Sequence, residues 1–346
     1  MALSSTPRRT TLADVAAVAG VSPATASRAL GNGKNVSTAT RQRVWAAAQQ
    51  LSFQPNRLAR SLRRGSTMAI GLLLPDVANA FYGAVLRGAQ GILEAAGYHV
   101  LVVNTNRTAS TEREALRSLH AHQVDGVLIA TYGGFEDIGV PVVFFDDVIP
   151  GVGVGAIALA NQQGVGLLVE HLVEAHGHRR IAFVGPPDTA QDGPAPPVFS
   201  NRERLEGFRT AVGRAALALP PEYVRTTTGS FVESARAIGA ELLAGEPRPT
   251  AIVGGTDTMS IGVLMAARDA GLRVPEDVAI VSFDEPMYAD LLAPSITSLD
   301  RHDLELGRRA AQLLLDALAV DGGPPPVPAV ERVRLSLRLR HSCGCP

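Results

Sequence analysis

The chain has 346 residues, of which 46% are hydrophobic and 19% charged, and its formal net charge is −1. This length allows one small and one large domain, or three modest ones. The chain contains no run of about 18 uncharged apolar residues, and no apolar segment follows the arginines of MALSSTPRRT, so we expect no membrane span, no export signal and a cytoplasmic location.

The near-zero net charge hides a strong segregation of charge along the chain. Residues 1–65 carry ten basic side chains against one acid, Asp14, whereas the rest of the chain carries 22 basic and 32 acidic side chains. The first segment is therefore +9 and the remainder −10. A basic head on an acidic body is typical of a phosphate-binding module joined to a domain that a polyanion would repel.

The stretch TLADVAAVAGVSPATASRAL in the basic segment predicts two short helices joined at a sharp turn. Apolar residues of the first helix recur at helical spacing, and Thr11 with Asp14 can form a capping box. Gly20 supplies the positive φ that the turn needs, Ser22 can cap the second helix, and Pro23 can occupy its first position. This pattern predicts a helix-turn-helix.

The second predicted helix carries small residues on its outer face, and a slim face lets an α-helix enter the major groove of DNA. The residues on that face are Pro23, Ala24, Ser27 and Arg28. Arg28 is our candidate for reading guanine, because its planar guanidinium matches the O6 and N7 acceptors. The alternative is an ordinary helical hairpin with a solvated Arg28.

A third predicted helix, residues 38–51, completes a three-helix head. The next helical segment, residues 56–64 (NRLARSLRR), is too short to be a stable helix alone. We interpret it as a linker that becomes ordered only against DNA or a partner copy of itself.

From residue 67 onward the pattern changes to alternating strands and helices, which predicts parallel α/β layers. AIGLLLP, HVLVVN, DGVLIA and VPVVFFD predict the strands of a first lobe, and IALA, RIAFVG, TAIVGG and VAIVSFD predict those of a second. The predicted helices span residues 77–96, 111–122, 163–175, 202–218, 231–244 and 259–270. Two such lobes create a cleft at the carboxyl ends of their strands, where small ligands bind.

No pattern of catalysis or cofactor binding stands out. GVGVG at 151–155 precedes a strand instead of following one, and neither a nucleophile elbow, a phosphate loop nor a metal-spaced histidine pair occurs. Cys343 and Cys345 are too close for a comfortable disulfide, and we expect free thiols that do not contribute to a core. A metal site of His341, Cys343 and Cys345 is the alternative. We expect no enzymatic activity, no cofactor and no metal.

TLADVAAVAGVSPATASRAL, followed by VST..R..V..A...L.F.PN..ARSL and AIGLLLPD, resembles bacterial regulators of the lactose-repressor (LacI/GalR) family. HGHRRIAFVGP, RERLEGF, GLRVPEDVAIVSFD and LRLRHSC extend the resemblance over essentially the whole chain. It implies a dimer with an N-terminal all-α helix-turn-helix head and a hinge helix that pairs in the minor groove. It also implies an α/β periplasmic-binding-protein-like core of two doubly wound parallel-sheet lobes, whose cleft binds an effector that alters operator affinity.

The resemblance also implies roles for individual residues. Pro23, Ala24 and Arg28 fall on the family's base-reading positions, and Leu62 falls on the hinge leucine that wedges between central base pairs. The residues that we expect to contact DNA are Thr11, Ser22, Pro23, Ala24, Thr25, Ser27, Arg28, Arg41, Asn56, Arg57, Ala59 and Leu62. The residues that we expect to line the effector cleft are Asn79, Phe81, Tyr82, Asp147, Ser200, Arg204, Phe231, Thr256, Asp257, Asp284 and Arg301.

This set fits a polyhydroxylated ligand, because aromatic faces cover a sugar ring while Asp and Arg form charge-assisted hydrogen bonds to hydroxyls. Each residue also has a purely structural interpretation. Phe81 and Phe231 could belong to the core, Asp284 could be a solvated loop carboxylate, and Arg204 could form a structural salt bridge with Asp284.

The chain departs from the family pattern in several places. Asp146 and Asp147 stand where sugar-binding relatives often have Asp-Arg, and Arg301 stands where they often have Gln, so the effector stays open. The segment 130–140 is short and lacks a helix that the family usually has, and 186–198 looks like an insertion. The chain carries no C-terminal leucine heptad, so we expect a homodimer and not a tetramer.

Together these features predict a ligand-responsive repressor of a carbohydrate-utilisation operon that binds palindromic double-stranded DNA as a homodimer, away from membranes. The alternatives are the same class of regulator with a nucleobase, nucleoside or other non-sugar effector, and an α/β enzyme with a fused DNA-binding head. A solute-binding protein is a further alternative, against which the basic head and the missing signal peptide argue. The expected domains are a head at 1–55, a hinge at 56–66 and a core at 67–346, with a first lobe at about 67–160 and 296–321 and a second at about 161–295 and 322–346.

Overall fold

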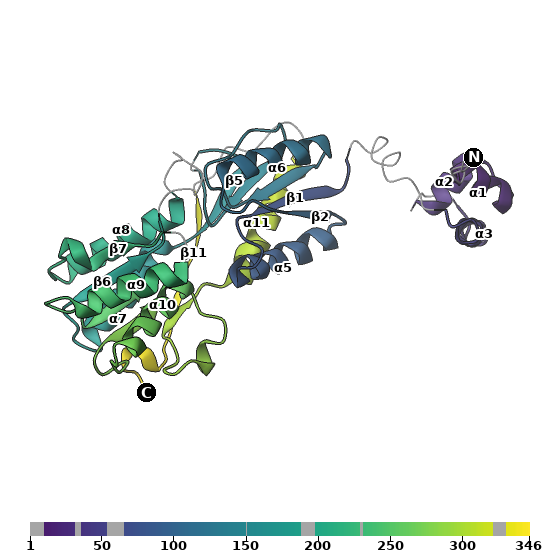
Figure 1. Cartoon of the computed structure of the whole chain (residues 1–346). Coiled ribbons are helices and arrows are strands. Elements are labelled where there is room, and N and C mark those ends of the chain that lie inside the picture. Colours follow the sequence, from purple (N-terminus) through teal and green to yellow (C-terminus); the bar gives the residue numbers. More distant parts are fainter. Residues whose placement is uncertain are drawn as a thin grey trace, which may run out of the picture. The chain divides into compact units, whose positions relative to one another are not determined.

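The structure is a computed structural model that describes residues 10–31, 36–53, 66–149, 151–187, 198–228, 231–320 and 330–346. The chain divides into two compact units, Met1–Thr67 and Met68–Pro346, which are described in turn (Figure 1). The described residues contain no helix long and apolar enough to cross a membrane. The expected hinge at 56–66, with Asn56, Arg57, Ala59 and Leu62, lies almost entirely outside the described residues.

The first unit is a helical head whose local signals behave as the sequence predicts. Its helices are α1 (Leu12–Ala19), α2 (Pro23–Leu30) and α3 (Thr38–Gln50). The capping box between Thr11 and Asp14 is present, and Gly20 ends α1 at φ 65°. Ser22 accepts a hydrogen bond from the N–H of Thr25 and so caps α2. Val15, Ala16, Ala19, Ala26, Ala29, Leu30, Val44, Ala47 and Ala48 form the buried core of the head.

The first lobe of the second unit is built on one parallel sheet, ordered β11-β5-β4-β3-β1-β2. Its strands are β1 (Ala69–Leu74), β2 (His99–Asn104), β3 (Gly126–Ile129), β4 (Val142–Phe145), β5 (Gly155–Leu159) and β11 (Glu331–Val333). Helices cover both faces, so the central strands are apolar on both sides, as the continuous apolar runs predict.

Alternate residues of a strand enter different cores in this lobe. Leu72 and Leu74 of β1 pack in the core that includes α5 (Ala80–Ala95) and α11 (Asp303–Leu318), whereas Leu73 packs in the core that includes α6 (Ala109–Ala121). The segment between β3 and β4 contains no helix, which confirms the expectation from its short length.

The second lobe repeats this plan with the parallel sheet β7-β6-β8-β9. Its strands are β6 (Ile181–Gly185), β7 (Val224–Thr226), β8 (Ala251–Gly254) and β9 (Ala279–Ser282). Its helices are α7 (Asn161–Glu174), α8 (Phe199–Arg214), α9 (Phe231–Ala244) and α10 (Asp257–Asp269). Phe183 packs in the core with residues of α7 and α8, and Ala182 and Val184 pack in the core with residues of α9 and α10.

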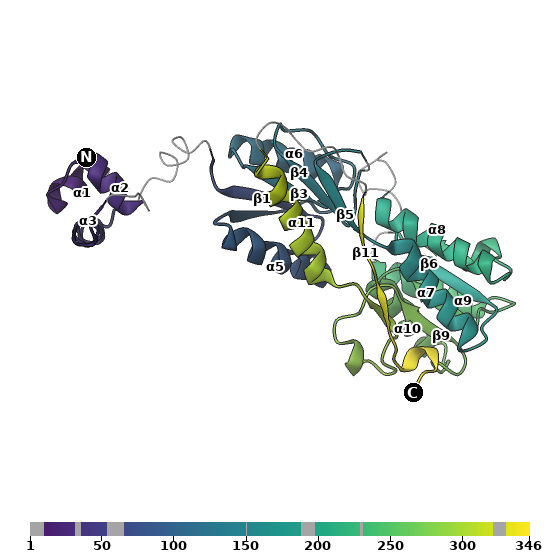
Figure 2. The same cartoon turned by 180° about the vertical axis from the view of Figure 1, so that it is seen from behind.

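The chain passes between the lobes along neighbouring segments, which Figure 2 shows from the side of α11 and β11. β5 leads directly into α7, and β10 (Ser298–Asp300) pairs antiparallel with β12 (Ser336–Arg338). β5, which contains the first three residues of IALA, pairs with β4 and β11 in the first sheet, whereas the sequence predicts IALA as a strand of the second lobe and assigns residues 322–346 to that lobe. Sequence alone does not show the pairing of β11, because a three-residue strand carries almost no periodicity.

The C-terminal tail overturns one expectation. Cys343 lies in the short helix η3 (His341–Cys343), is only 1% exposed and packs in the main hydrophobic core, so it is not a peripheral thiol. Ser342 next to it donates a hydrogen bond to the carbonyl of Ile280 in β9 at 2.5 Å. The tail is thereby fixed to the second sheet. The expected insertion at 186–198 lies mostly outside the described residues.

Candidate DNA-binding face and effector cavity

Helix α2 presents the face that the sequence assigns to DNA. Pro23, Ala24 and Arg28 are exposed, Ser27 is half-buried, and Ala26 and Ala29 face the core of the head. The Nε of Arg28 donates to the carbonyl of Ala24 at 3.3 Å, so the guanidinium lies along the exposed face of its own helix. Small side chains beside one arginine suit a helix that reads base edges in the major groove.

Arg41 has a structural role that the sequence did not predict. One terminal nitrogen of its guanidinium donates to the carbonyls of Ala29 and Gly31, each at 3.2 Å. These carbonyls lie at the C-terminal end of α2, where the helix dipole is negative and backbone acceptors lack helical partners. Arg41 therefore braces α3 against the end of α2, and its contact with a DNA phosphate stays a prediction.

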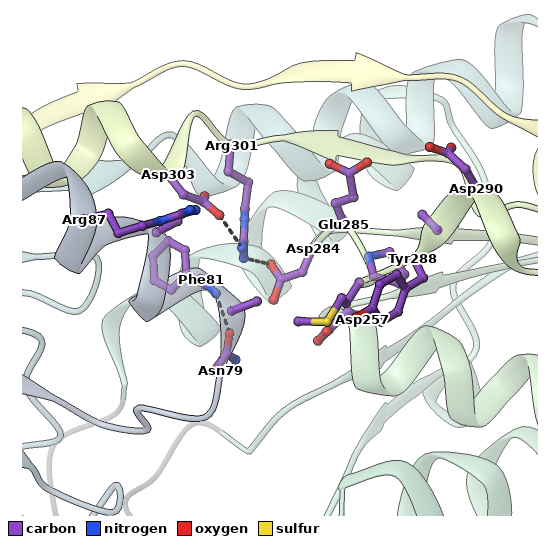
Figure 3. A pocket seen from close by; sticks show the side chains of 15 residues that line it. Asn79, Phe81, Arg87, Asp257, Asp284, Glu285, Tyr288, Asp290, Arg301 and Asp303 are labelled. Atoms are coloured by element: carbon purple, nitrogen blue, oxygen red, sulfur yellow. Dashed lines mark hydrogen bonds and ion pairs between the residues drawn. The ribbon is translucent and has the colours of Figure 1, made fainter.

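A cavity of ≈ 350 Å³ lies between the two lobes (Figure 3). Five of the expected effector residues line it: Asn79, Phe81, Asp257, Asp284 and Arg301. Asn79 and Phe81 come from the start of α5 in the first lobe, Asp257 and Asp284 follow β8 and β9 in the second, and Arg301 follows β10. The carboxyl ends of parallel strands thus build the cavity, and its volume lies in the range of small-molecule sites.

Arg301 is the central cation of the cavity. Its guanidinium lies 2.5 Å from Asp284 Oδ1 and 3.0 Å from Asp303 Oδ2. The same group lies over the ring of Phe81, 4.4 Å from its centroid, which is a cation–π contact. These contacts hold the two acids and the aromatic ring in fixed positions around the cavity (Figure 3).

Arg204 contacts Asp284, a residue of the cavity, but does not line the cavity itself. Its guanidinium lies 3.6 Å from Asp284 Oδ1 and donates to the carbonyl of Gly255 at 2.9 Å and to Asn161 Oδ1 at 3.2 Å. It also lies 4.0 Å from the ring centroid of Phe283. The structure therefore shows the Arg204–Asp284 salt bridge, which is the structural alternative to ligand binding. Contact of Arg204 with a ligand stays a prediction.

Three carboxyls of this region have a buried oxygen atom without a hydrogen-bond partner among the described residues. They are Oδ1 of Asp284 and Oδ1 of Asp303, at the cavity, and Oδ1 of Asp146, after β4. Burial, reinforced by the neighbouring carboxyl of Asp147, raises the pKa of Asp146 to about 8.

The remaining expected effector residues lie outside the cavity lining and have identifiable structural roles. Asp147 accepts a hydrogen bond from the N–H of Ser200 at 2.9 Å, which ties the first lobe to the start of α8. Thr256 caps α10. Tyr82 is buried, and desolvation raises its pKa well above the usual value. Phe231 lies 5.3 Å from the guanidinium of Arg107.

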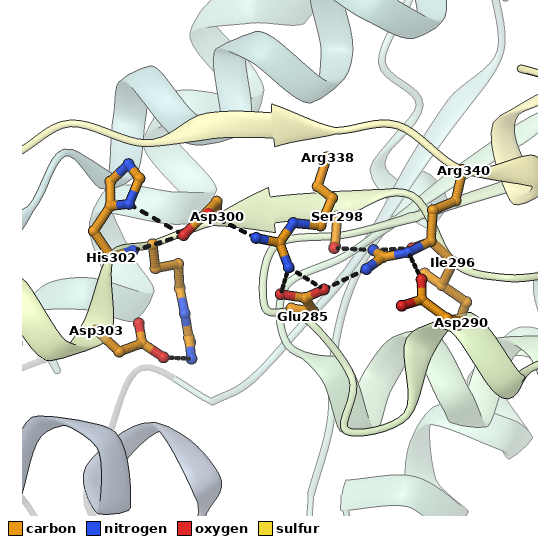
Figure 4. A network of polar contacts seen from close by, with 10 residues as sticks. Glu285, Asp290, Ile296, Ser298, Asp300, His302, Asp303, Arg338 and Arg340 are labelled. Carbon is orange, nitrogen blue, oxygen red and sulfur yellow. Dashed lines mark hydrogen bonds and ion pairs between the residues drawn. The ribbon is translucent and has the colours of Figure 1, made fainter. Parts of the chain in front are cut away.

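The outer wall of the cavity is a loop that an arginine network fastens (Figure 4). Arg338 and Arg340 of the C-terminal strand and tail both bind Glu285, and Arg340 also lies 2.5 Å from Asp290. Glu285 and Asp290 line the cavity together with Met287 and Tyr288. No local pattern in the sequence indicates this wall, because the arginines that hold it lie about fifty residues further along the chain.

Asp303 was also missed, although its signal is visible in the sequence. It stands two residues after Arg301 and begins α11, where a carboxylate is favoured by the helix dipole. The pair could have been found from its spacing, whereas Arg87 and Tyr288 of the lining carry no such signal.

Comparison with known proteins supports both units. Residues 11–56 match the family model of bacterial regulatory proteins of the lacI family, and residues 169–343 match the periplasmic binding protein-like domain. The ribose operon repressor of Bacillus subtilis is 32% identical over 312 residues, covering 88% of this chain and 90% of that one. Catabolite control protein A of Priestia megaterium is 29% identical over 311 residues, covering 88% and 91%.

Solved structures agree with this result. The lac repressor dimer bound to operator and the anti-inducer ONPF superposes with a TM-score of 0.83 at 26% identity, covering 97% of this chain and 99% of that one. The transcriptional regulator CelR in complex with cellobiose gives a TM-score of 0.70 at 29% identity, covering 96% and 100%. The chain therefore belongs to the LacI family of DNA-binding bacterial transcriptional regulators.

Proposed function

We propose that this regulator represses a carbohydrate-utilisation operon and releases or tightens its grip on operator DNA when a hydroxyl-rich ligand fills the interlobe cavity. The observation that carries the proposal is the pairing of Arg301 with Asp284 and Asp303 beside the ring of Phe81. Carboxylates and a guanidinium in fixed positions suit the hydroxyl donors and acceptors of such a ligand. The names of the ribose operon repressors and of the CelR–cellobiose complex agree with this ligand class.

The charge of the cavity narrows the ligand class further. Five acidic residues line it against two arginines: Asp257, Asp284, Glu285, Asp290, Asp303, Arg87 and Arg301. Arg301 is already paired with Asp284 and Asp303, so it is not available to neutralise an anionic ligand. The cavity therefore favours a neutral sugar or polyol over a sugar phosphate or an organic acid. A nucleobase or nucleoside is the second candidate, but Arg301 already covers one face of Phe81, which leaves that face closed to stacking.

The DNA-bound form is a homodimer on a palindromic operator. Met287, Tyr288 and Leu291 are 57%, 70% and 82% exposed in one short segment, which is more apolar surface than an isolated chain needs to expose there. A two-fold dimer presents two heads, and the symmetry of the operator mirrors that of the protein. The regulator performs no catalysis in this proposal and acts in the cytoplasm, where its operator lies.

The test is a thermal-shift screen of neutral sugars, polyols, sugar phosphates, nucleobases and nucleosides, followed by operator titrations by fluorescence anisotropy with and without the hit. A ligand at a hundredfold excess over its Kd stabilises the folded protein by about 2.7 kcal/mol, which a melting curve resolves. We expect a neutral sugar or polyol to raise the melting temperature and to change operator affinity.

Asp257→Asn tests whether the hit occupies this cavity. It keeps the size of a lining side chain but removes its charge, so we expect it to weaken the hit about tenfold, which corresponds to one charge-assisted hydrogen bond. Asp269→Asn, at the opposite end of α10, is the matched control and should bind normally. Stabilisation by sugar phosphates or nucleobases alone, or equal binding by both variants, would refute the proposed ligand and its site respectively.

A further inference from the structure

The C-terminal tail brings two thiols against two imidazoles at the end of the second lobe. The ligand atoms of His171, His176, Cys343 and Cys345 all lie within 4.8 Å of one another. Sγ of Cys345 lies 3.5 Å from Nε2 of His171 and 3.4 Å from Nε2 of His176. Sγ of Cys343 lies 3.4 Å from Nε2 of His171. The histidines and cysteines are separated by about 170 residues in the chain, so the fold alone assembles this group.

These distances match the dimensions of a tetrahedral zinc site. Bond lengths of about 2.3 Å to sulfur and about 2.0 Å to nitrogen place neighbouring S and N ligands of a tetrahedron about 3.5 Å apart. Three of the four sulfur–nitrogen distances in the cluster are 3.4, 3.5 and 3.4 Å. The remaining pairs lie within 4.8 Å, so closing them around an ion requires side-chain movements of about 1 Å.

The backbone between the two cysteines is shaped to bring both sulfurs to the same place. Gly344 adopts φ 100°, a conformation that L side chains rarely adopt, and a Cβ at this position would lie 3.2 Å from Nδ1 of His176. The glycine thus lets the chain turn tightly against the imidazole. His341, the ligand that sequence spacing suggested, is instead engaged with Ser295 Oγ at 2.8 Å.

We propose that His171, His176, Cys343 and Cys345 bind one Zn²⁺ ion in a closed tetrahedral site that fastens the C-terminal tail to the end of α7. Two thiolates and two imidazoles are the ligand set of structural zinc sites, and four protein ligands leave no open position for catalysis. The two cysteines are separated by a single residue, which disfavours a disulfide between them as the alternative pairing. The site shares no residue with the effector cavity or with the DNA-binding face.

The tail that carries the two cysteines also contacts the wall of the effector cavity. Arg340, three residues before Cys343, holds Glu285 and Asp290 of the cavity wall. An ion that fixes the tail therefore also fixes the anchor of this wall. Because a metal that binds only the folded state adds to folding stability, loss of zinc should lower the melting temperature of the core.

The first experiment measures metal in the full chain, expressed with zinc, purified with a thiol-free reductant and dialysed against a weak chelator. We expect about one zinc per chain in the wild type, and less than about one tenth of that in Cys345→Ser and His176→Ala, since each removes one of four ligands. His341→Gln is the matched control in the same tail and should keep its zinc. Cys345 and His176 lie at the edge of the core, so these variants leave the buried Cys343 in place.

The second readout is Co²⁺ substitution, which does not depend on how zinc was acquired. The wild type should show the intense visible absorption of tetrahedral cobalt together with a sulfur-to-cobalt charge-transfer band, and Cys345→Ser should lose most of both. Wild-type protein without stoichiometric zinc, zinc retained equally by all variants, or a Cys343–Cys345 disulfide in reductant-treated protein would each overturn the proposal.

Discussion

The DNA-binding face and the effector cavity are built on opposite principles. All of the candidate base-reading residues lie on α2, a single eight-residue helix, and each cap and turn that presents them comes from the residues next to it. The cavity instead takes its side chains from residues 79 to 303, and its wall is held by arginines beyond residue 330. A site made within one helix can be interpreted from local chemistry, whereas a site made by a fold depends on buried partners that are distant in sequence.

One residue allows the two regions to be followed separately. Trp45 is the only tryptophan of the chain and lies 48% exposed on α3 of the head. Tryptophan fluorescence therefore reports the head, and far-ultraviolet circular dichroism is dominated by the much larger core. The unfolding of the head and that of the core can therefore be measured separately in the same protein.

The largest effect should come from Arg301→Ala in the cavity. Removing this guanidinium leaves Asp284 and Asp303 buried without their main partner, so we expect the core to lose about 3–5 kcal/mol of unfolding free energy. Urea titrations followed by circular dichroism should show it, while the Trp45 transition stays in place. Arg87→Ala, an exposed arginine of the same cavity, is the control. If Arg301→Ala melts like Arg87→Ala, the cavity does not depend on this network.

The second effect should appear on the DNA side alone. Arg28→Ala should weaken specific operator binding by about 1–3 kcal/mol and flatten the preference at one base pair, because a bidentate guanine contact is lost. Core stability and effector affinity should not change. Anisotropy titrations on single-base operator variants test this, and uniform weakening on every variant would assign Arg28 to the phosphate backbone.

Arg41→Ala should damage the head without directly changing base preference. Losing the two hydrogen bonds to the end of α2 should lower the stability of the head by about 1–2 kcal/mol. The Trp45 transition should shift while the core transition does not. Arg43→Ala, exposed on the same helix, is the control. Weaker operator binding with an unshifted Trp45 transition would instead support the phosphate contact that the sequence suggested.

A further effect concerns pH and belongs to the core. Asp146 has a pKa of about 8 in the folded chain against an ordinary value of 3.8, so the folded state binds its proton more tightly than the unfolded state does. Core stability should therefore fall as pH rises between about 4 and 8. In Asp146→Asn this fall should be smaller by at least about 1 kcal/mol, which is about 2–4 °C in melting temperature for a unit of this size.

Asparagine suits this test, because it tolerates the φ of 58° that residue 146 adopts. Asp316→Asn, an exposed carboxyl on α11, is the control and should melt with the wild-type pH dependence. An unchanged pH dependence in Asp146→Asn would mean that Asp147 or another buried acid carries the proton.

Local sequence patterns are enough to predict the head, the α/β class of the core and the regulator family. Caps, a glycine turn and helical or strand periodicity act over a few residues, so Thr11, Gly20 and Ser22 predict their own structures. Five of the residues that we expect to bind the effector line the cavity, because the carboxyl ends of parallel strands lie at one edge of their sheet.

Contacts between distant parts of the chain determine which charged groups pair with one another. Through such contacts Arg41 binds the C-terminal end of α2, Arg204 pairs with Asp284, and Cys343 lies in the core beside His171. In the same way β11 pairs with β5 in the first sheet. All of these cases have the same cause. Burial makes the cost of an unpaired polar group large, and the partner that removes this cost can come from any part of the chain, so no local pattern encodes it.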